Sequence, residues 1–432
     1  MGGPRGRRPR ARARGHPRRH PLPPSSQASI DLHSISVPAH FNEPLTEAQR
    51  HVEIFEHSAL LDAAALLPPR SPARLLAVFG FAVSVVSTVR RTSKPFKDVM
   101  GGTVDLIAPD RRVRVLAEKV AHKPPAVAVI AQGAAWTFEA HDELHVEVTF
   151  SGIKLAPTGS LRLTFADGGE YRWNTPAFYV RDVMSGKLRL AHRGAFFAKC
   201  MATGDEVRAT AVEAPGKAAR AQAAAGGPPL MSELRGAYVA GPGRPPHEAT
   251  VSGRFHGACV ATTPDGASTT LYTAFPAHEG GGRWQFSAWA TRLGGAPPGL
   301  VARVPPTDAR LRADVALFEL GCYGAADKEK AALEAAQRSA RAAAPAAWAT
   351  PQWFKPVPGT DVWGRPYTRW VYAGGYWEAR AAGAWPAAVA ARAAALAARP
   401  RPRRASRASW AGSRRASAAG SADSTPYTTP RG

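Results

Sequence analysis

Residues 92–125, TSKPFKDVMGGTVDLIAPDRRVRVLAEKVAHKPP, place cations beside residues that restrict the backbone of this 432-residue chain. Two parts of the stretch do so: residues 94–102, KPFKDVMGG, and residues 118–125, EKVAHKPP. Pro124 fixes its own φ and pushes Lys123 toward an extended conformation. A rigid cationic turn at the end of a strand suits an anion such as a phosphate. We therefore expect these two parts to form an anion site.

The chain is strongly basic, with a formal net charge of +23, which by itself suggests nucleic acid or an anionic membrane as partner. The excess belongs to the ends of the chain. Residues 1–24 contain eight arginines and no acid, and residues 379–432 contain ten arginines and one aspartate. Only +6 of the +23 remains for the middle. This distribution argues against nucleic acid as the partner of the central region.

Composition divides the chain into three parts. Residues 1–29 are rich in Arg and Pro and are expected to be a disordered basic tail, and residues 379–432 are expected to be a low-complexity Ala/Arg/Ser tail. Residues 30–378 have the mixed composition of a globular domain that can bury a substantial core. Within it, residues 214–247 are rich in Ala, Gly and Pro and are interpreted as a loop or insertion.

The cysteine content and the apolar runs indicate a cytoplasmic protein without a transmembrane segment. The three cysteines are far apart and include no CxxC pair, which is typical of a reduced compartment. The longest apolar run, residues 75–89, contains two serines and is short for a membrane span. The N-terminus has no apolar signal-peptide core.

Hydrophobic periodicity predicts helices at both ends of the central region and strands between them. Helices are expected over residues 46–66, 71–84 and 326–342, with a short one possible near 387–398. From 111 to 200 apolar and polar residues alternate, as in LHVEVTF at 144–150, and Gly-containing turns separate the runs. Short strands at this spacing favour a meander or barrel over βαβ units. Further strands are expected over residues 249–261, 269–275 and 283–290.

Three charged residues lie on one side of the helix predicted over 326–342. Lys330, Glu334 and Arg338 are four residues apart, so each lies about 40° further round the helix and all three share one stripe. A carboxylate between two cations holds both and reduces their repulsion. Taken alone, the pattern fits a solvated salt-bridge ladder on a helix surface.

Several segments together resemble the oxysterol-binding-protein-related family of lipid transfer proteins. Residues 94–102 are similar to the family's lysine-proline-phenylalanine-asparagine-proline run with its following glycine-glutamate-threonine, and residues 118–125 to its glutamate-glutamine-valine-serine-histidine-histidine-proline-proline run. Residues 41–45, FNEPL, and 304–312, VPPTDARLR, have similar counterparts in that family. The resemblance covers about residues 34–378. Departures from the motifs are Lys97 for asparagine, Gly102 for glutamate, Ala121 for serine and Lys123 for the second histidine.

The resemblance implies a mainly β (α+β) fold: an incomplete antiparallel β-barrel enclosing an apolar tunnel, with an N-terminal helical lid and collar and a C-terminal α/β subdomain. The segment before Pro38 is the candidate lid. The implied function is non-enzymatic transfer of a sterol or another membrane lipid in exchange with phosphatidylinositol 4-phosphate, with peripheral contact to anionic membranes, including membrane contact sites, and no cofactor. The family's phosphoinositide site uses a lysine, glutamate and arginine at the spacing found on the 326–342 helix. The lipid headgroup-binding residues implied here are Lys94, Lys97, His122, Lys123, Lys330, Glu334 and Arg338.

The requirements for a lipid carrier also follow from physical chemistry, without reference to the family. A sterol-sized apolar body loses on the order of 10 kcal/mol when it is exposed to water, so its carrier needs an apolar enclosure. A lipid phosphate would remain at the mouth of that enclosure, where cations meet it. One enclosure used by two lipids makes them compete, which is the basis of exchange.

Other functions find less support in the sequence. No nucleophile, base and oxyanion set can be assembled, so no catalytic residue is assigned. The one metal-like cluster, residues 141–145, HDELH, lies where alternation predicts a strand, and no metal ligand is assigned. Two alternatives stay open: a lipid sensor or scaffold that binds phosphoinositide without transfer, and a nucleic-acid binder acting through its basic tails.

Overall fold

The structure is a computed structural model that describes residues 38–149, 152–186, 188–218, 232–278, 284–295 and 299–398, together with Gly2 and Ala221. The basic N-terminal tail and the candidate lid before Pro38 lie outside the described residues, as does the C-terminal tail from residue 399. No helix in the described ranges combines the length and apolarity needed to cross a bilayer.

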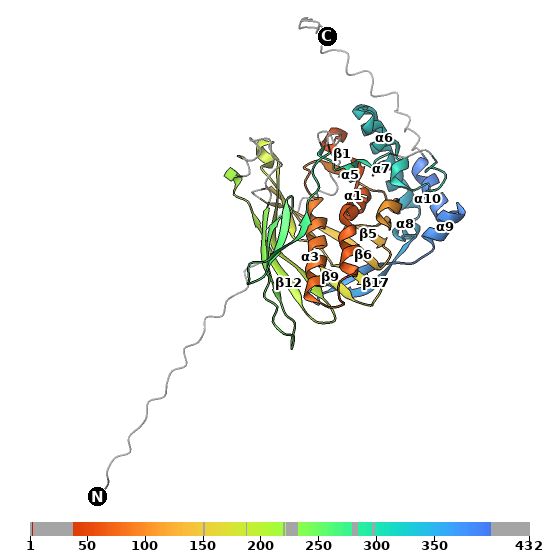
Figure 1. The fold of residues 1–432 in the computed structure, drawn as a ribbon. Coiled ribbons are helices and arrows are strands. Elements are labelled where there is room, and N and C mark those ends of the chain that lie inside the picture. The colour runs from red at the N-terminus through yellow and green to blue at the C-terminus, as the bar shows by residue number, and fades with distance from the viewer. Residues whose placement is uncertain are drawn as a thin grey trace, which may run out of the picture.

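A 14-stranded antiparallel sheet dominates the structure (Figure 1). Its strand order is β16-β15-β14-β13-β12-β11-β10-β7-β6-β5-β4-β3, and β8 and β9 join it beside β6 and β11. The strands are β3 (Thr103–Ala108), β4 (Val113–His122), β5 (Pro125–Gln132), β6 (Trp136–Thr149), β7 (Gly152–Thr158), β8 (Leu161–Phe165), β9 (Glu170–Trp173), β10 (Ala177–Arg181), β11 (Arg189–Cys200), β12 (Glu206–Glu213), β13 (Ser232–Val239), β14 (Thr250–Arg254), β15 (Ala258–Thr262) and β16 (Ser268–Thr273). Neighbours in sequence are mostly neighbours in the sheet, because short turns join antiparallel strands.

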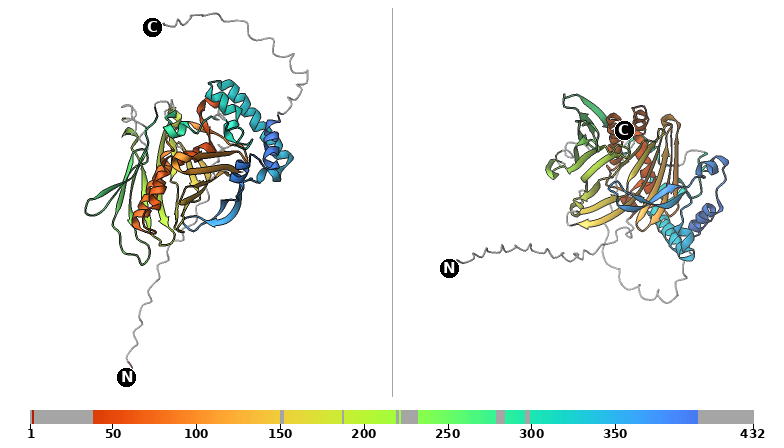
Figure 2. Two further views of the ribbon diagram at one scale, coloured as in Figure 1. Left: turned by 45° about the vertical axis from the view of Figure 1, so that its right-hand side comes forward. Right: turned by 90° about the horizontal axis from the view of Figure 1, so that it is seen from below.

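The sheet curves round into a ring that does not close as a barrel, which confirms the predicted incomplete barrel (Figure 2). Inside the curve lie the N-terminal helices α1 (Glu47–Glu53), α2 (Ala59–Ala65) and α3 (Pro72–Ser87). Ser71 caps α3 by accepting a hydrogen bond from the Arg74 N–H, and Pro72 occupies its first turn. The run expected to be a buried helix is therefore α3, which packs against β9, β11, β12, β15 and β16.

Aromatic side chains fill the space between α3 and the sheet. Phe55 meets Phe138 edge-on with ring centroids 5.2 Å apart, and Phe79 lies 5.3 Å from Phe196. All four side chains are fully buried. At about 25 cal/mol per Å² of apolar surface, such rings make this core the main source of stability for the curved sheet.

The C-terminal part covers the outer face of β4 and β5. It consists of the hairpin β17 (Phe354–Thr360) and β18 (Pro366–Tyr372) with α9 (Tyr376–Ala382) and α10 (Ala387–Ala397). Leu116 and Ile130 on the outer face form a second core with Trp353, Tyr376 and Val389. The packed body of the protein therefore continues past residue 378 through α10, which is the short helix foreseen near 387–398.

The remaining elements connect these layers. They are η1 (Ala39–Phe41), β1 (Asn42–Thr46), η2 (Ile54–His57), β2 (Lys94–Phe96), η3 (Pro109–Arg111), η4 (Val183–Ser185), α5 (Ala288–Thr291), η6 (Ala309–Leu311), α6 (Ala313–Glu319), α7 (Tyr323–Ala343) and α8 (Pro345–Ala349). The helix expected over 46–66 is divided into α1, η2 and α2, and the one expected over 326–342 is α7.

Two local predictions are wrong. The region 214–247 contains β13, which pairs along its whole length with β12, so it is not simply a loop or insertion. The Ala-, Gly- and Pro-rich composition of the region concealed this strand, whose own sequence is SELRGAYV. Gly236 is required at its position, because a Cβ there would lie 2.1 Å from the Arg208 carbonyl oxygen. The strand expected over 283–290 is also not observed; Ser287 instead accepts a hydrogen bond from the Ala290 N–H and caps α5.

Candidate functional site: a cationic mouth beside an apolar wall

The segment with Lys94 and Lys97 is held in place by the N-terminal FNEP sequence. β2 pairs in parallel with β1, and the Asn42 side-chain amide donates to the carbonyls of Lys94 and Pro95, both at 3.1 Å. The Lys97 carbonyl accepts a hydrogen bond from Arg312 at 2.5 Å. The backbone is fixed from both sides, so the two lysine side chains start from a defined position.

Helix α7 lies against this segment and carries Lys330 and Glu334. The Met100 N–H donates to the Gln337 side chain at 2.9 Å, and the Ala39 N–H donates to Asp327 at 2.7 Å. Lys330 is buried, with its Nζ 6.0 Å from the centre of the Phe96 ring. The helix and β2, more than 200 residues apart in sequence, therefore form one surface.

The charges of the two segments affect each other. Burial, together with the neighbouring cations Lys97 and Lys330, lowers the pKa of Lys94 to about 8, although Glu47 and Glu334 act in the opposite direction. Burial also lowers the pKa of Lys330. Gathering ammonium groups in a partly dehydrated place is unfavourable unless an anion is bound, which is the electrostatic character of an anion site.

The β4–β5 turn contributes His122 and Lys123, which are both exposed. His122 pairs with Pro125 across the turn at the end of β4. Although the His122 side chain is exposed, the surrounding protein partly desolvates its ring and lowers its pKa, and the nearby cations Arg341, Lys119, Lys123 and Lys97 lower it in addition. The turn therefore lies close enough to Lys97 and to α7 for their charges to interact.

Arg338 and Arg341 differ in their relation to the site. Both side chains are exposed, and Arg338 lies about 80° from Lys330 round the helix. Arg341, which the sequence reasoning missed, follows Gln337 by four residues and lies about 20° from Lys330 round the helix. It is also the charge with the largest effect on His122. Its spacing of eleven residues from Lys330 is the signal that could have identified it.

We call the cations Lys94, Lys97, His122, Lys123, Lys330 and Arg341 the mouth. An ion pair between Lys119 and Glu47 lies next to them. Lys119 Nζ contacts Glu47 Oε2 at 2.6 Å, and Glu47 lies in the first turn of α1. Although burial works in the opposite direction, Lys119 holds the pKa of Glu47 below its usual value. Glu47 also faces Lys94, so it is the acid that links α1 to the cations.

Other motif residues have structural contacts. The Glu118 carboxylate accepts hydrogen bonds from the Gln352 and Trp353 N–H groups at 2.8 and 2.9 Å, and so attaches the C-terminal part to β4. Burial raises its pKa to about 7. Gly102 suits its position because a Cβ there would lie 2.9 Å from the Val99 carbonyl oxygen.

Beyond the β4–β5 turn, β6 continues and exposes an apolar inner face. Phe138 and Ala140 of β6 belong to the core, so Leu144, Val146 and Val148, at every second position after them, lie on the same face. Val148 is 45% exposed. Since Ala126 at the turn pairs with Glu143, this exposed face begins at the level of His122 and Lys123.

The next two strands extend the same face. Val146 lies opposite Leu155, and Leu155 lies opposite Phe178. Directly opposed residues of antiparallel strands point to the same side of a sheet. We call the half-buried or exposed residues of this face the apolar wall; they are Leu144, Val146, Val148, Ile153, Leu155, Phe178 and Val180.

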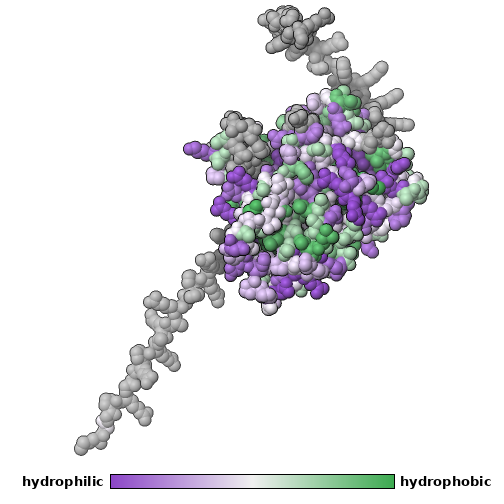
Figure 3. Space-filling model, in the orientation of Figure 1, coloured by the Kyte–Doolittle hydropathy of each residue, from purple (hydrophilic) through white to green (hydrophobic). Residues whose placement is uncertain are grey.

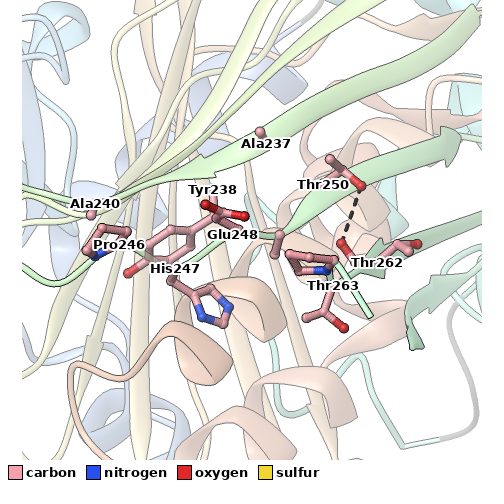
Figure 4. A pocket seen from close by; sticks show the side chains of 11 residues that line it. Ala237, Tyr238, Ala240, Pro246, His247, Glu248, Thr250, Thr262 and Thr263 are labelled. Carbon is pink, nitrogen blue, oxygen red and sulfur yellow. Dashed lines mark hydrogen bonds between the residues drawn. The ribbon is translucent and has the colours of Figure 1, made fainter. Parts of the chain in front are cut away.

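Two cavities lie elsewhere in the described part of the structure. One of about 440 Å³ is bordered by Tyr238, His247 and Thr262 near β13 to β15 (Figure 4). Another of about 300 Å³ lies among α6, α7 and α10. The headgroup-binding residues expected from the sequence line neither. In the described residues no group of three or more His, Cys, Asp or Glu could hold a metal ion, and residues 141–145 lie in β6 with His141 stacked on Tyr367.

The outer surface also divides by polarity. On the face shown in Figure 3, hydrophilic residues gather where α1 approaches the C-terminal helices, and an apolar area lies over α3.

Comparison with known proteins gives consistent matches. The family model described as oxysterol-binding protein matches residues 25–381. Oxysterol-binding protein-related protein 2B of Arabidopsis thaliana is 31% identical over 362 residues, which cover 82% of this chain and 49% of that protein. Protein 1B of the same plant is 30% identical over 375 residues and is covered to 70%. The chain spans about half the length of the first relatives it matches, between 43% and 70%.

Solved structures with the same fold include two domains with bound lipids. The Osh3 ORD from Saccharomyces cerevisiae in complex with PI(4)P is 25% identical with a TM-score of 0.69, over 82% of this chain and 90% of that one. The Osh1 ORD domain in complex with ergosterol is 25% identical with a TM-score of 0.70, over 83% and 87% of the two chains.

Proposed function

This chain belongs to the oxysterol-binding protein family, and we propose that it carries a sterol or another membrane lipid in exchange with phosphatidylinositol 4-phosphate. It would act as a carrier without catalysis, at the cytoplasmic side of membranes. The lipid-binding unit would be the region 30–378 together with the packed helices α9 and α10. Residues 1–29 and the tail beyond would add charge for contact with anionic membranes.

One observation carries this proposal: a partly exposed apolar wall begins at the level of a turn where cations from three chain segments meet. A phosphoinositide has the same two-part chemistry, with apolar chains joined to a phosphorylated headgroup. We assign the headgroup to Lys94, Lys97, His122, Lys123, Lys330 and Arg338, with Glu334 holding the cations of α7 in position. Arg341 is added to this set because of its place on the helix.

A sterol would use the apolar wall but not the cations. Since either lipid needs the same wall, binding of one displaces the other, and this competition allows two gradients to be coupled. The relatives with bound PI(4)P and with bound ergosterol support the assignment of the two ligands.

The test is transfer between two populations of liposomes. Donor vesicles contain cholesterol and acceptor vesicles contain phosphatidylinositol 4-phosphate. We expect the protein to move cholesterol faster when the phosphoinositide is present on the opposite vesicles. Binding of both lipids without net movement would support a sensor or scaffold instead, and absence of lipid binding would contradict the proposal. Salt-dependent binding of DNA or RNA by the whole chain would favour the nucleic-acid alternative.

A further inference from the structure

A buried histidine lies at the end of the apolar wall with no partner for either ring nitrogen. His192 is on β11, directly opposite Phe178, and so continues the row formed by Val146, Leu155 and Phe178. Its exposure is 0%, and neither Nδ1 nor Nε2 has a hydrogen-bond partner. A buried polar group without a partner lowers the stability of the folded protein by about 1–3 kcal/mol. Such groups are rare in native structures and often have a functional role.

The surroundings of His192 keep the imidazole neutral. Phe178 and Phe255 contact the ring with centroid distances of 6.0 and 5.1 Å, and burial lowers the pKa of His192 to about 3. His256, the nearest other titratable ring at 6.4 Å, also has an unpartnered, buried Nε2. A neutral imidazole has one donor and one acceptor. This pair matches a hydroxyl group, which also donates and accepts, and it offers no charge to a phosphate.

Other polar groups nearby are already occupied. Ser84 and Ser87 on α3 donate to helix carbonyls at 2.7 and 2.6 Å, and the Tyr272 hydroxyl donates to the Phe255 carbonyl at 3.0 Å. These three hydroxyl groups therefore already have a hydrogen-bond partner, whereas Nδ1 and Nε2 of His192 and Nε2 of His256 have none.

We propose that His192 is the specificity-determining residue for the neutral lipid and that it hydrogen-bonds the single hydroxyl of a sterol lying on the apolar wall. This inference rests on the proposed function and identifies which end of the wall receives the polar end of the sterol. The phosphoinositide does not use this contact, because its polar groups remain with the cations at the mouth. His192 thus contributes to binding of the sterol and not to binding of the phosphoinositide, although both ligands lie on the same apolar wall.

The test compares two ligands on the full chain: cholesterol, and cholestene, the same skeleton without the hydroxyl. We expect wild-type protein to prefer cholesterol on the order of tenfold, the value of one hydrogen bond. His192→Leu should reduce this preference to near unity by weakening cholesterol alone. His192→Asn keeps a donor and an acceptor and should restore part of the preference. His145→Leu, on the exposed outer face of β6, serves as the matched histidine control.

Two outcomes would overturn the inference. One is an unchanged preference for cholesterol in His192→Leu, and the other is an equal loss of cholesterol and cholestene, which would mean that the ring only packs. Phosphatidylinositol 4-phosphate binding of the variant shows whether it is folded. If wild-type protein binds neither sterol, the sterol part of the proposed function fails, and this result differs from a wild-type protein that binds both sterols equally, which overturns only the role of His192.

Discussion

Two groups of basic residues that look alike in the sequence lie in opposite electrostatic surroundings. At the mouth, Lys94, Lys97 and Lys330 approach one another, and burial together with this crowding lowers the pKa of Lys94. In the PPTDARLR segment, Arg310 contacts Asp105 at 2.5 Å and Asp308 at 2.7 Å. There the carboxylates of Asp308 and Asp105 raise the pKa of Arg310 despite its burial.

The difference separates binding residues from structural ones. Arg310, Asp105 and Asp308 join η6 to β3, and Arg380 of α9 contacts Asp105 as well. The network has its counter-charges inside the protein and needs no ligand. The mouth gathers cations in excess, and its missing charge would come from an anionic ligand. Variants of the two regions should therefore differ: those in the Arg310 network should lose stability, and those in the mouth should lose phosphoinositide binding.

Removing Arg310 should have the largest effect. Arg310→Ala leaves the buried Asp308 carboxylate without its ion-pair partner and leaves Asp105 with Arg380 alone, which costs about 3–5 kcal/mol of unfolding free energy. Denaturant unfolding measures the loss, and binding of both lipids should fall with the folded fraction. Arg292→Ala is the control, because its ion pair with Asp110 is exposed and is worth about 1 kcal/mol or less. Equal stability of the two variants would show that the network does not hold the fold.

Reversing the charge of the turn should remove one ligand and spare the other. The double variant His122→Glu, Lys123→Glu should lose phosphatidylinositol 4-phosphate uptake, because two acids would face its phosphate. Sterol binding and the unfolding midpoint should stay near wild type, since both residues are exposed. His145→Glu is the control for adding an acid to a strand surface. Equal loss of both ligands would mean that the turn is needed for the fold.

The two arginines near the end of α7 should contribute unequally to phosphoinositide binding. Arg341→Ala should weaken phosphoinositide binding roughly tenfold by removing one charge-assisted hydrogen bond. Arg338→Ala should weaken it by the same amount or less, since Arg338 lies about 80° from Lys330 round α7, compared with about 20° for Arg341. Isothermal titration with a soluble short-chain phosphoinositide measures both, and Arg235→Ala on β13 is the control. If Arg338→Ala weakened phosphoinositide binding strongly and Arg341→Ala did not, Arg338 and not Arg341 would be the headgroup-binding arginine of α7.

The pH dependence should be the smallest effect. The pKa of Lys94 is about 8, and a bound phosphate favours the charged ammonium, so affinity for the phosphoinositide should be full below pH 8 and fall as pH rises through it. We expect a several-fold loss between about pH 7 and 9, measured with the same titration. Lys94→Arg stays charged throughout and should flatten the profile. A lysine with its ordinary pKa would give no change in this window.

Much of the fold could be predicted from local pattern. Alternation such as that of residues 144–150 gave the strands, and the Ser71-Pro72 pair gave the start of α3, because both signals depend only on neighbouring residues. The two errors arose where a local signal was absent or misleading. β13 (SELRGAYV) lies in a region whose Ala, Gly and Pro content suggested a loop, and Gly236 occupies a close approach of neighbouring backbones that no periodicity in the sequence reports.

The sequence by itself determined the family, the order of strands and helices, and the cations that α7 and the two motif segments supply. It did so because periodicity, capping and motif spacing are properties of short stretches. Only the tertiary structure decided that Arg310 meets two buried carboxylates while Lys94 is crowded by Lys97 and Lys330, that the charge of Arg341 acts on His122, and that the row of the apolar wall continues to His192. These are contacts between segments distant in the chain, and charge and burial become defined only when the fold brings them together.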